Sequence, residues 1–177
     1  SAEVLDVTSI SWFPDGTRMA VTAISPTQRA VSIWTVSTAG GTPRKLRDYA
    51  IAGPITPDGS RIAFGNLEMQ PQGWIGHGVW VMRVDGTDAH EVLPWKENLD
   101  YQSVAWSPDG RNILFVLAGD PGGVVQGILG ISDLTGAPPK VLVSDPKFAS
   151  VQCFPNAAWL PDGRILFTRT EAPPNEG

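Results

Sequence analysis

Short apolar segments separated by polar turns recur along the whole chain of 177 residues. Four of them share the same pattern, with aliphatic, β-branched or aromatic residues in sequence, at residues 19–21, 62–64, 113–115 and 165–167. Segments of this length and composition are typical of β-strands and are too short for helices that cross from one strand to the next. The pattern therefore predicts an all-β protein.

A five-residue turn precedes each of these four strands. The copies read WFPDG at 12–16, ITPDG at 55–59, WSPDG at 106–110 and WLPDG at 159–163. Proline fixes φ at the first corner, aspartate hydrogen-bonds across the bend, and glycine takes the positive φ that other residues avoid. Each copy is therefore expected to be the hairpin turn between the first two strands of a repeat.

Third strands are expected at 31–36, 79–84 and 128–131, and each is followed by a second glycine-containing turn. A short fourth strand follows around Leu46, Val92 and Val141. These fourth strands have charged neighbours, which discourage pairing at an exposed edge. The neighbours are Arg44, Lys45, His90, Glu91 and Lys140. Four antiparallel strands in about 45 residues is the period of a β-propeller blade.

The repeats predict a partial β-propeller of about three and a half four-stranded antiparallel blades, within one domain over residues 1–177. The blades would span about 5–48, 49–96 and 97–146, with an incomplete blade at 147–177. Trp12, Trp106 and Trp159 recur in register, so we expect them to pack in the core between blades. The uncovered apolar faces of the end blades predict self-association, with two chains completing a ring.

The stretches WSPDGRNILF at 106–115 and VWVMRVDGTDA at 79–89 resemble the TolB-like propeller repeat. Residues 33–46 resemble the same repeat in the C-terminal regions of bacterial eukaryotic-like serine/threonine kinases. Ile55 in place of tryptophan and the missing residue after Gly163 depart from the pattern.

The resemblance implies a propeller and an extracytoplasmic setting in a bacterium. It leaves the function open, because such repeats occur in TolB, which binds a lipoprotein, in sensor regions of membrane kinases and in the gating propeller of prolyl-oligopeptidase-like peptidases. A noncatalytic segment that binds a protein or a small ligand is our first hypothesis. A peptidase gate and a structural scaffold remain alternatives.

The charge of the chain limits the classes of partner that it is expected to bind. The net charge is −5 and the thirteen basic residues are scattered, which argues against nucleic acid and anionic membranes. The chain contains no apolar stretch long enough to insert in a membrane, and no leader is visible at its start.

No catalytic or cofactor motif is present, and the content of two histidines and one cysteine, Cys153, argues against a zinc site. The sequence thus predicts no catalytic residue, no cofactor and no metal. With one cysteine an internal disulfide is impossible.

Any binding site is expected in long, irregular connections on one face of the repeat scaffold, at 66–78, 94–101, 119–125 and 144–156. Their aromatic and acidic residues are the candidates for ligand contact. These are Trp74, His77, Trp95, Glu97, Asp100, Tyr101, Asp120 and Phe148. As an alternative, the tryptophans seal neighbouring blades and the carboxylates are solvated loop charges.

Overall fold

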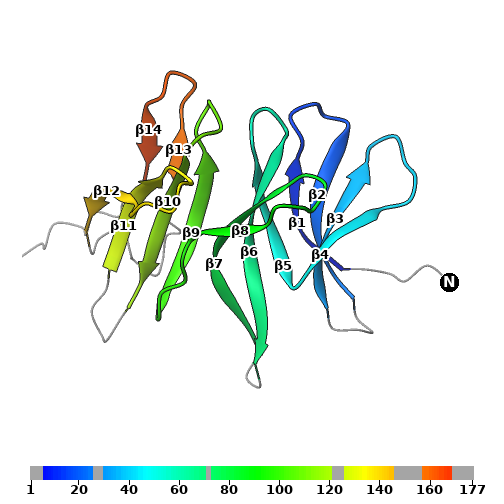
Figure 1. Cartoon of the computed structure of the whole chain (residues 1–177), viewed down its shortest axis with the longest axis horizontal. Coiled ribbons are helices and arrows are strands. Elements are labelled where there is room, and N and C mark those ends of the chain that lie inside the picture. Colours follow the sequence, from blue (N-terminus) through cyan, green and yellow to red (C-terminus); the bar gives the residue numbers. More distant parts are fainter. Residues whose placement is uncertain (1–5, 26–29, 71–72, 121–125, 146–156, 169–177) are drawn as a thin grey trace, which may run out of the picture. The chain divides into compact units, whose positions relative to one another are not determined.

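The protein is all-β in its computed structural model, which describes residues 6–25, 30–70, 73–120, 126–145 and 157–168 (Figure 1). The described strands pair antiparallel with their neighbours in sequence, in three four-stranded sheets and one two-stranded hairpin. This confirms the predicted fold class of four-stranded antiparallel units. The chain divides into two compact units, Ser1–Trp95 and Lys96–Gly177, which are described separately below.

The first unit holds two sheets. The first sheet consists of β1 (Asp6–Trp12), β2 (Arg18–Ile24), β3 (Val31–Ser37) and β4 (Arg44–Asp48). The second sheet consists of β5 (Ala50–Ile55), β6 (Arg61–Gln70), β7 (Gly73–Arg83) and β8 (His90–Leu93).

The second unit holds the third sheet and a hairpin. The third sheet consists of β9 (Leu99–Trp106), β10 (Ile113–Gly119), β11 (Gln126–Ser132) and β12 (Lys140–Ser144). The hairpin consists of β13 (Ala157–Trp159) and β14 (Ile165–Phe167).

The Pro-Asp-Gly turns have the predicted geometry. In the third copy the amide of Gly110 donates to the carbonyl of Ser107 at 2.9 Å, and Gly110 has a φ of 68°. The Asp109 carboxylate accepts the amide of Arg111 at 3.0 Å, which closes the bend. The other three glycines also have positive φ, at Gly16, Gly59 and Gly163. Local sequence therefore determines these four hairpins.

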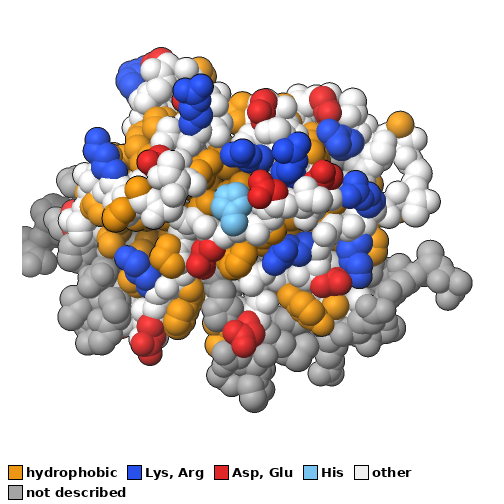
Figure 2. Space-filling view, in the orientation of Figure 1, with side chains coloured by type: hydrophobic (Ala, Val, Ile, Leu, Met, Phe, Trp, Pro, Cys, Tyr) orange, Lys and Arg blue, Asp and Glu red, His pale blue; other side chains and the backbone are white. Residues whose placement is uncertain are grey.

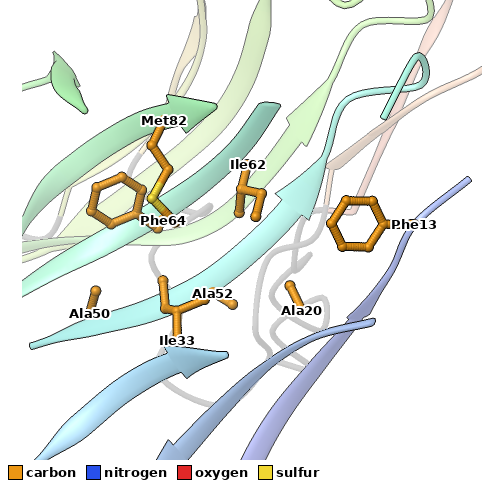
Figure 3. Close-up of a cluster of buried hydrophobic side chains, with 8 residues drawn as sticks. All are labelled: Phe13, Ala20, Ile33, Ala50, Ala52, Ile62, Phe64 and Met82. Atoms are coloured by element: carbon orange, nitrogen blue, oxygen red, sulfur yellow. The ribbon is translucent and has the colours of Figure 1, made fainter. Parts of the chain in front are cut away.

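A buried apolar cluster joins the two sheets of the first unit (Figure 3). Its members are Phe13, Ala20, Ile33, Ala50, Ala52, Ile62, Phe64 and Met82. Small alanines on β2 and β5 let the sheets approach, while the larger side chains of β3, β6 and β7 fill the space between them. Burial of these side chains is the main stabilising term for this pair of sheets.

One polar side chain also ties these two sheets together. Thr22 on β2 is fully buried, and its hydroxyl oxygen accepts the amide of Ala52 on β5 at 2.8 Å. The hydroxyl of Ser9 on β1 donates to the same oxygen at 2.7 Å. The buried amide at the sheet contact thus has a hydrogen-bond acceptor, as buried polar groups require.

In the second unit, the hairpin packs on the third sheet. Leu114, Val116, Leu129 and Ala157 form the buried cluster. Trp159 and Ile165 are partly buried against it. The same alternation of apolar residues therefore builds both the sheet and the contact with the next hairpin.

Two predictions about this fold are wrong. Trp12 was expected in the core, but it is 58% exposed, because it points away from the face of the first sheet that packs on the second. Residues 66–78 were expected to form an irregular loop, but β6 and β7 pair from Asn66 opposite His77 to Gln70 opposite Gly73. The ladder continues beyond a bulge at Gly65 and Asn66, because backbone pairing does not need a strongly apolar sequence.

Candidate functional site

The eight predicted ligand contacts do not form a single cluster in the described residues. Phe148 lies outside the described ranges. Trp74 and His77 lie on β7, opposite Met69 and Asn66, where the backbone register alone is described. Trp95 is 42% exposed at the end of the first unit. Glu97, Asp100, Tyr101 and Asp120 belong to the second unit, where the structure places them around one connection.

This connection, residues 96–100, is a tight turn that leads into β9. The amide of Leu99 donates to the carbonyl of Lys96 at 3.2 Å. Asn98 adopts a φ of 55°, a left-handed conformation that asparagine tolerates better than most residues. The carbonyl of Asn98 accepts the amide of Asp120 at 3.1 Å, which ties the turn to the end of β10.

Gly119 makes this close approach possible. A Cβ atom at this position would lie only 2.0 Å from the carbonyl oxygen of Asn98. A side chain at position 119 would therefore push the turn away from β10. Sequence reasoning missed the roles of Gly119 and Asn98, although a glycine at the end of a strand is a known signal of close backbone approach.

The register brings two of the predicted carboxylates to one face of the sheet end. Asp100 pairs with Ala118, and Leu99 with Gly119. Asp120 follows opposite Asn98, so Asp100 and Asp120 are diagonal neighbours, a relation in which residues on adjacent strands lie about 7–8 Å apart. Both side chains are exposed, as is Glu97 in the same turn. We call Glu97, Asp100 and Asp120 the acidic edge.

Tyr101 does not join the acidic edge. Consecutive residues of a strand point to opposite faces, so Tyr101 lies on the face opposite Asp100. Its ring packs edge-on against Phe115, with 5.7 Å between the ring centroids, and the residue is half-buried. Packing within the sheet is thus the observed role of this side chain.

The acidic edge differs from a metal site. In the described part of the chain, no group of three or more histidine, cysteine, aspartate or glutamate side chains is placed to hold a metal ion. Exposed carboxylates at a strand end can instead accept hydrogen bonds from cationic or amide donors. The chemistry open to the acidic edge is recognition of such donors.

The turn aspartates form a separate group whose oxygens are engaged locally. Hydrogen bonds from the Thr56 hydroxyl and from Ser60 lower the pKa of Asp58 to about 2. Donors in the same turns lower the pKa of five further carboxylates. Backbone and hydroxyl groups do so for Asp15, Asp85, Asp109 and Asp133. The Arg164 side chain, followed by its backbone amide, does so for Asp162. The aspartates of the four Pro-Asp-Gly turns thus stabilise their own turns, as predicted, and Asp85 and Asp133 do the same in the turns after β7 and β11.

Basic and acidic side chains are interspersed on the face shown in Figure 2. Several basic groups pair with neighbouring carboxylates, among them Lys45 with Asp48 at 3.0 Å and Arg164 with Asp162 at 2.7 Å. Arg47 instead lies over the ring of Phe64, 5.0 Å from its centroid. Within the described ranges, no helix is long and apolar enough to cross a membrane.

The first sheet carries a second surface, an exposed apolar one, whose residues the sequence analysis did not single out. On β1, Val7, Ile10 and Trp12 lie on one face of the first sheet and are 55%, 55% and 58% exposed. The signal was present as alternating apolar residues, but the pattern does not say whether another layer covers them. Trp12, Ile55, Trp106 and Trp159 occupy the same position at the end of the first strand of each repeat. We call the face of each sheet on which this residue lies the front face, and the opposite face the back face.

Comparison with known proteins gives the fold. No family profile and no curated protein matches the sequence. Among solved structures, an oligogalacturonate lyase in complex with manganese matches with a TM-score of 0.68 and 17% identity over 92% of this chain and 46% of that one. The oligogalacturonate lyase from Vibrio parahaemolyticus matches with a TM-score of 0.69 and 13% identity over 100% and 50%. A TolB-type protein from Agrobacterium tumefaciens matches with a TM-score of 0.64 and 18% identity over 94% and 58%.

Solved structures of peptidases also match this chain. The β-propeller domain of the trilobed protease from Pyrococcus furiosus matches with a TM-score of 0.57 over 80% of this chain. A prolyl endopeptidase structure matches with a TM-score of 0.64 over 92%. The chain therefore has a TolB-like β-propeller fold, and it spans about half the length of the first three structures.

Proposed function

We propose that this chain is a noncatalytic β-propeller segment that binds a cationic segment of a protein partner through the acidic edge. One observation carries the proposal: the backbone hydrogen bond from the Asp120 amide to the Asn98 carbonyl ties the turn at 96–100 to the end of β10, beside which the exposed carboxylates lie. The scaffold beneath them is a four-stranded sheet, and binding residues are often presented in this way on connections between strands. The segment would bind its partner and catalyse no reaction.

The electrostatic part of this proposal sets its expected strength. Exposed ion pairs contribute about 0.2–1 kcal/mol each, so three carboxylates together supply about 0.6–3 kcal/mol. Removing all three charges should therefore weaken binding of a cationic peptide by about threefold to a hundredfold, since 1.4 kcal/mol is tenfold in affinity. Salt should weaken the remaining attraction in the native chain, because exposed charges are screened.

The test uses an oligolysine peptide as probe, with an oligoglutamate peptide of equal length as its counterpart. Calorimetry compares the native chain with the triple variant Glu97→Gln, Asp100→Asn, Asp120→Asn. The control, Asp88→Asn with Glu91→Gln, removes two exposed charges from the first unit. Equal affinity of the native chain and the triple variant for oligolysine would contradict the proposal, as would equal affinity for the two peptides.

For the whole protein, we propose the sensor or interaction part of a larger bacterial protein, such as a serine/threonine kinase, outside the cytoplasm. The resemblance of residues 33–46 to kinase-linked repeats supports it. The matches to peptidases support the alternative of a gating propeller. The open reading frame around this sequence distinguishes them: a kinase domain with an apolar span favours the sensor, a Gly-x-Ser-x-Gly hydrolase domain favours the gate, and neither favours a scaffold.

A further inference from the structure

An arginine follows every Pro-Asp-Gly turn within two residues, at positions 18, 61, 111 and 164. In the first and last repeats this arginine pairs with the aspartate of its own turn. Arg18 lies 3.4 Å from Asp15, and Arg164 lies 2.7 Å from Asp162. In the second repeat, Arg61 forms no ion pair with any described residue. Arg61 therefore lacks the carboxylate partner that the same turn supplies in the first and last repeats.

Arg61 instead lies directly opposite a second arginine. The register of β6 and β7 pairs Arg61 with Arg83. The amide of Val84 donates to the carbonyl of Ser60 at 3.1 Å, so the pair next to the arginines is hydrogen-bonded and the arginine pair is not. Side chains approach most closely in such non-hydrogen-bonded pairs, where the Cβ atoms lie about 4.5–5.5 Å apart. The two guanidinium groups can therefore reach the same ligand.

The arginine pair is exposed and unfavourable for the sheet by itself. Ile62 lies opposite Ile55 on the front face, so Arg61 and Arg83 project from the back face. Both residues are exposed. Like charges directly opposite each other destabilise a sheet, and the equivalent arginine of the first sheet lies opposite a serine. An anion bound between the two guanidinium groups would remove this repulsion.

The two nearest turn carboxylates do not take this place. Donors of their own turns hydrogen-bond to Asp58 and Asp85 and lower the pKa of each carboxyl group. Asp85 also interacts electrostatically with Arg83 and with Arg44, so one carboxylate is shared by two guanidinium groups. Among the described residues, neither carboxylate forms an ion pair with Arg61 or Arg83.

We propose that Arg61 and Arg83 bind a phosphoryl group between their guanidinium groups. At neutral pH a phosphate monoester carries a charge of about −2 and three acceptor oxygens, which suits two cationic groups with several donors each. A carboxylate has one charge and two oxygens, which a single arginine can bind bidentately. Both arginines belong to one sheet, so their proximity depends only on the β6–β7 register. The site is separate from the acidic edge and does not depend on it.

The first experiment titrates inorganic phosphate into the native 177-residue chain at constant ionic strength and follows the arginine Nε–Hε signals by NMR. Saturable shifts of the Arg61 and Arg83 signals are expected. Arg61→Gln and Arg83→Gln should each weaken phosphate binding by about tenfold, the effect of losing one hydrogen-bonded contact between charged groups. The absence of a saturable shift, or equal shifts of all arginine signals, would overturn the proposal.

Arg18→Gln is the matched control, because Arg18 has the same position in the first repeat. It pairs with Asp15 and lies opposite a serine, so the first sheet does not present two guanidinium groups together. Arg18→Gln removes one positive charge, as Arg61→Gln does, and should leave phosphate binding unchanged. Equal weakening by the two changes would mean that only the total charge matters and would overturn the proposal. Thermal melts verify that each variant is folded.

The repulsion between the arginines gives a second measurement. Without phosphate and at low ionic strength, Arg83→Gln should be at least as stable as the native chain, because it removes the like-charge contact. Phosphate stabilises folded proteins in general, so the comparison is between the two chains at the same phosphate concentration. The Tm of the native chain should rise more than that of the variant, and equal rises would contradict a site at these arginines.

Two further probes identify the source of the phosphoryl group. Phosphoserine and acetate are titrated under the same conditions as inorganic phosphate. Tighter binding of phosphoserine than of inorganic phosphate would assign the site to a phosphorylated side chain, and the reverse order would assign it to the free ion. Acetate binding as tight as phosphate binding would overturn the choice of a phosphoryl group.

Discussion

Replacement of Thr22 by valine tests the polar link between the first two sheets. Valine preserves the shape of the side chain but removes the oxygen that accepts the Ala52 amide at 2.8 Å and the Ser9 hydroxyl at 2.7 Å. Thr22 is fully buried, and Ala52 is only 6% exposed. Water therefore cannot readily replace the lost acceptor.

The expected cost follows from the group left unpaired. A buried amide that loses its acceptor costs about 1–3 kcal/mol in unfolding free energy. Ser9 is closer to solvent, so its hydroxyl can rotate toward water and adds little. We expect Thr22→Val to destabilise the protein by about 2 kcal/mol, which for a chain of this size lowers the Tm by roughly 4–8 °C.

The assay is urea unfolding followed by tryptophan fluorescence, together with a thermal melt. Thr22→Ser is the matched control, because it keeps the acceptor oxygen and removes only a methyl group, at a cost of about 1 kcal/mol. Ser9→Ala should cost about 0.5–1 kcal/mol, since one hydrogen bond is lost while the Ala52 amide keeps its acceptor. The reasoning is refuted if Thr22→Val is as stable as the native chain, or if Thr22→Ser is destabilised more than Thr22→Val.

Two further predictions concern the acidic edge and the turns. Gly119→Ala should destabilise the protein by about 1–3 kcal/mol and weaken oligolysine binding, because its Cβ would collide with the Asn98 carbonyl. Gly65→Ala is the control, since a Cβ there meets nothing within 4 Å. Equal effects of the two changes on oligolysine binding would count against a role of Gly119 at the acidic edge. Asp58 has a folded-state pKa of about 2 against an ordinary value of 3.8, so its ionised form contributes stability that is complete above about pH 4 and is lost as the pH falls toward 2. The stability difference between the native chain and Asp58→Asn, measured by urea unfolding at pH 5 and pH 2.5, should accordingly shrink in acid; a constant difference would contradict the assignment.

Much of the architecture could be predicted because it depends on short-range sequence. The strands after the turns at 62–64 and 113–115 lie in β6 and β10. The candidate site was predictable only in part. The acidic residues at 97, 100 and 120 were singled out from composition, but their proximity depends on the β9–β10 register and on the Asn98 carbonyl, which join residues about twenty positions apart.

The extended hairpin of β6 and β7 shows a similar limit. Residues 73–78 read GWIGHG, a glycine-rich sequence that local propensity assigns to a loop. Pairing with β6 nevertheless keeps the segment extended as far as Gly73. Strand propensity depends on neighbours, so a single segment does not reveal that its partner continues alongside it.

The sequence by itself determined the repeat, the Pro-Asp-Gly hairpins and the face on which each apolar side chain lies. These features are set by φ preferences and by the two-residue alternation of a strand, both of which act over a few residues. The tertiary structure alone decided which of those faces is covered. Trp12 and Trp106 occupy the same position in nearly the same local sequence, yet one is 58% exposed and the other 7%. Burial is a relation between layers distant in sequence, and no local pattern contains the second layer.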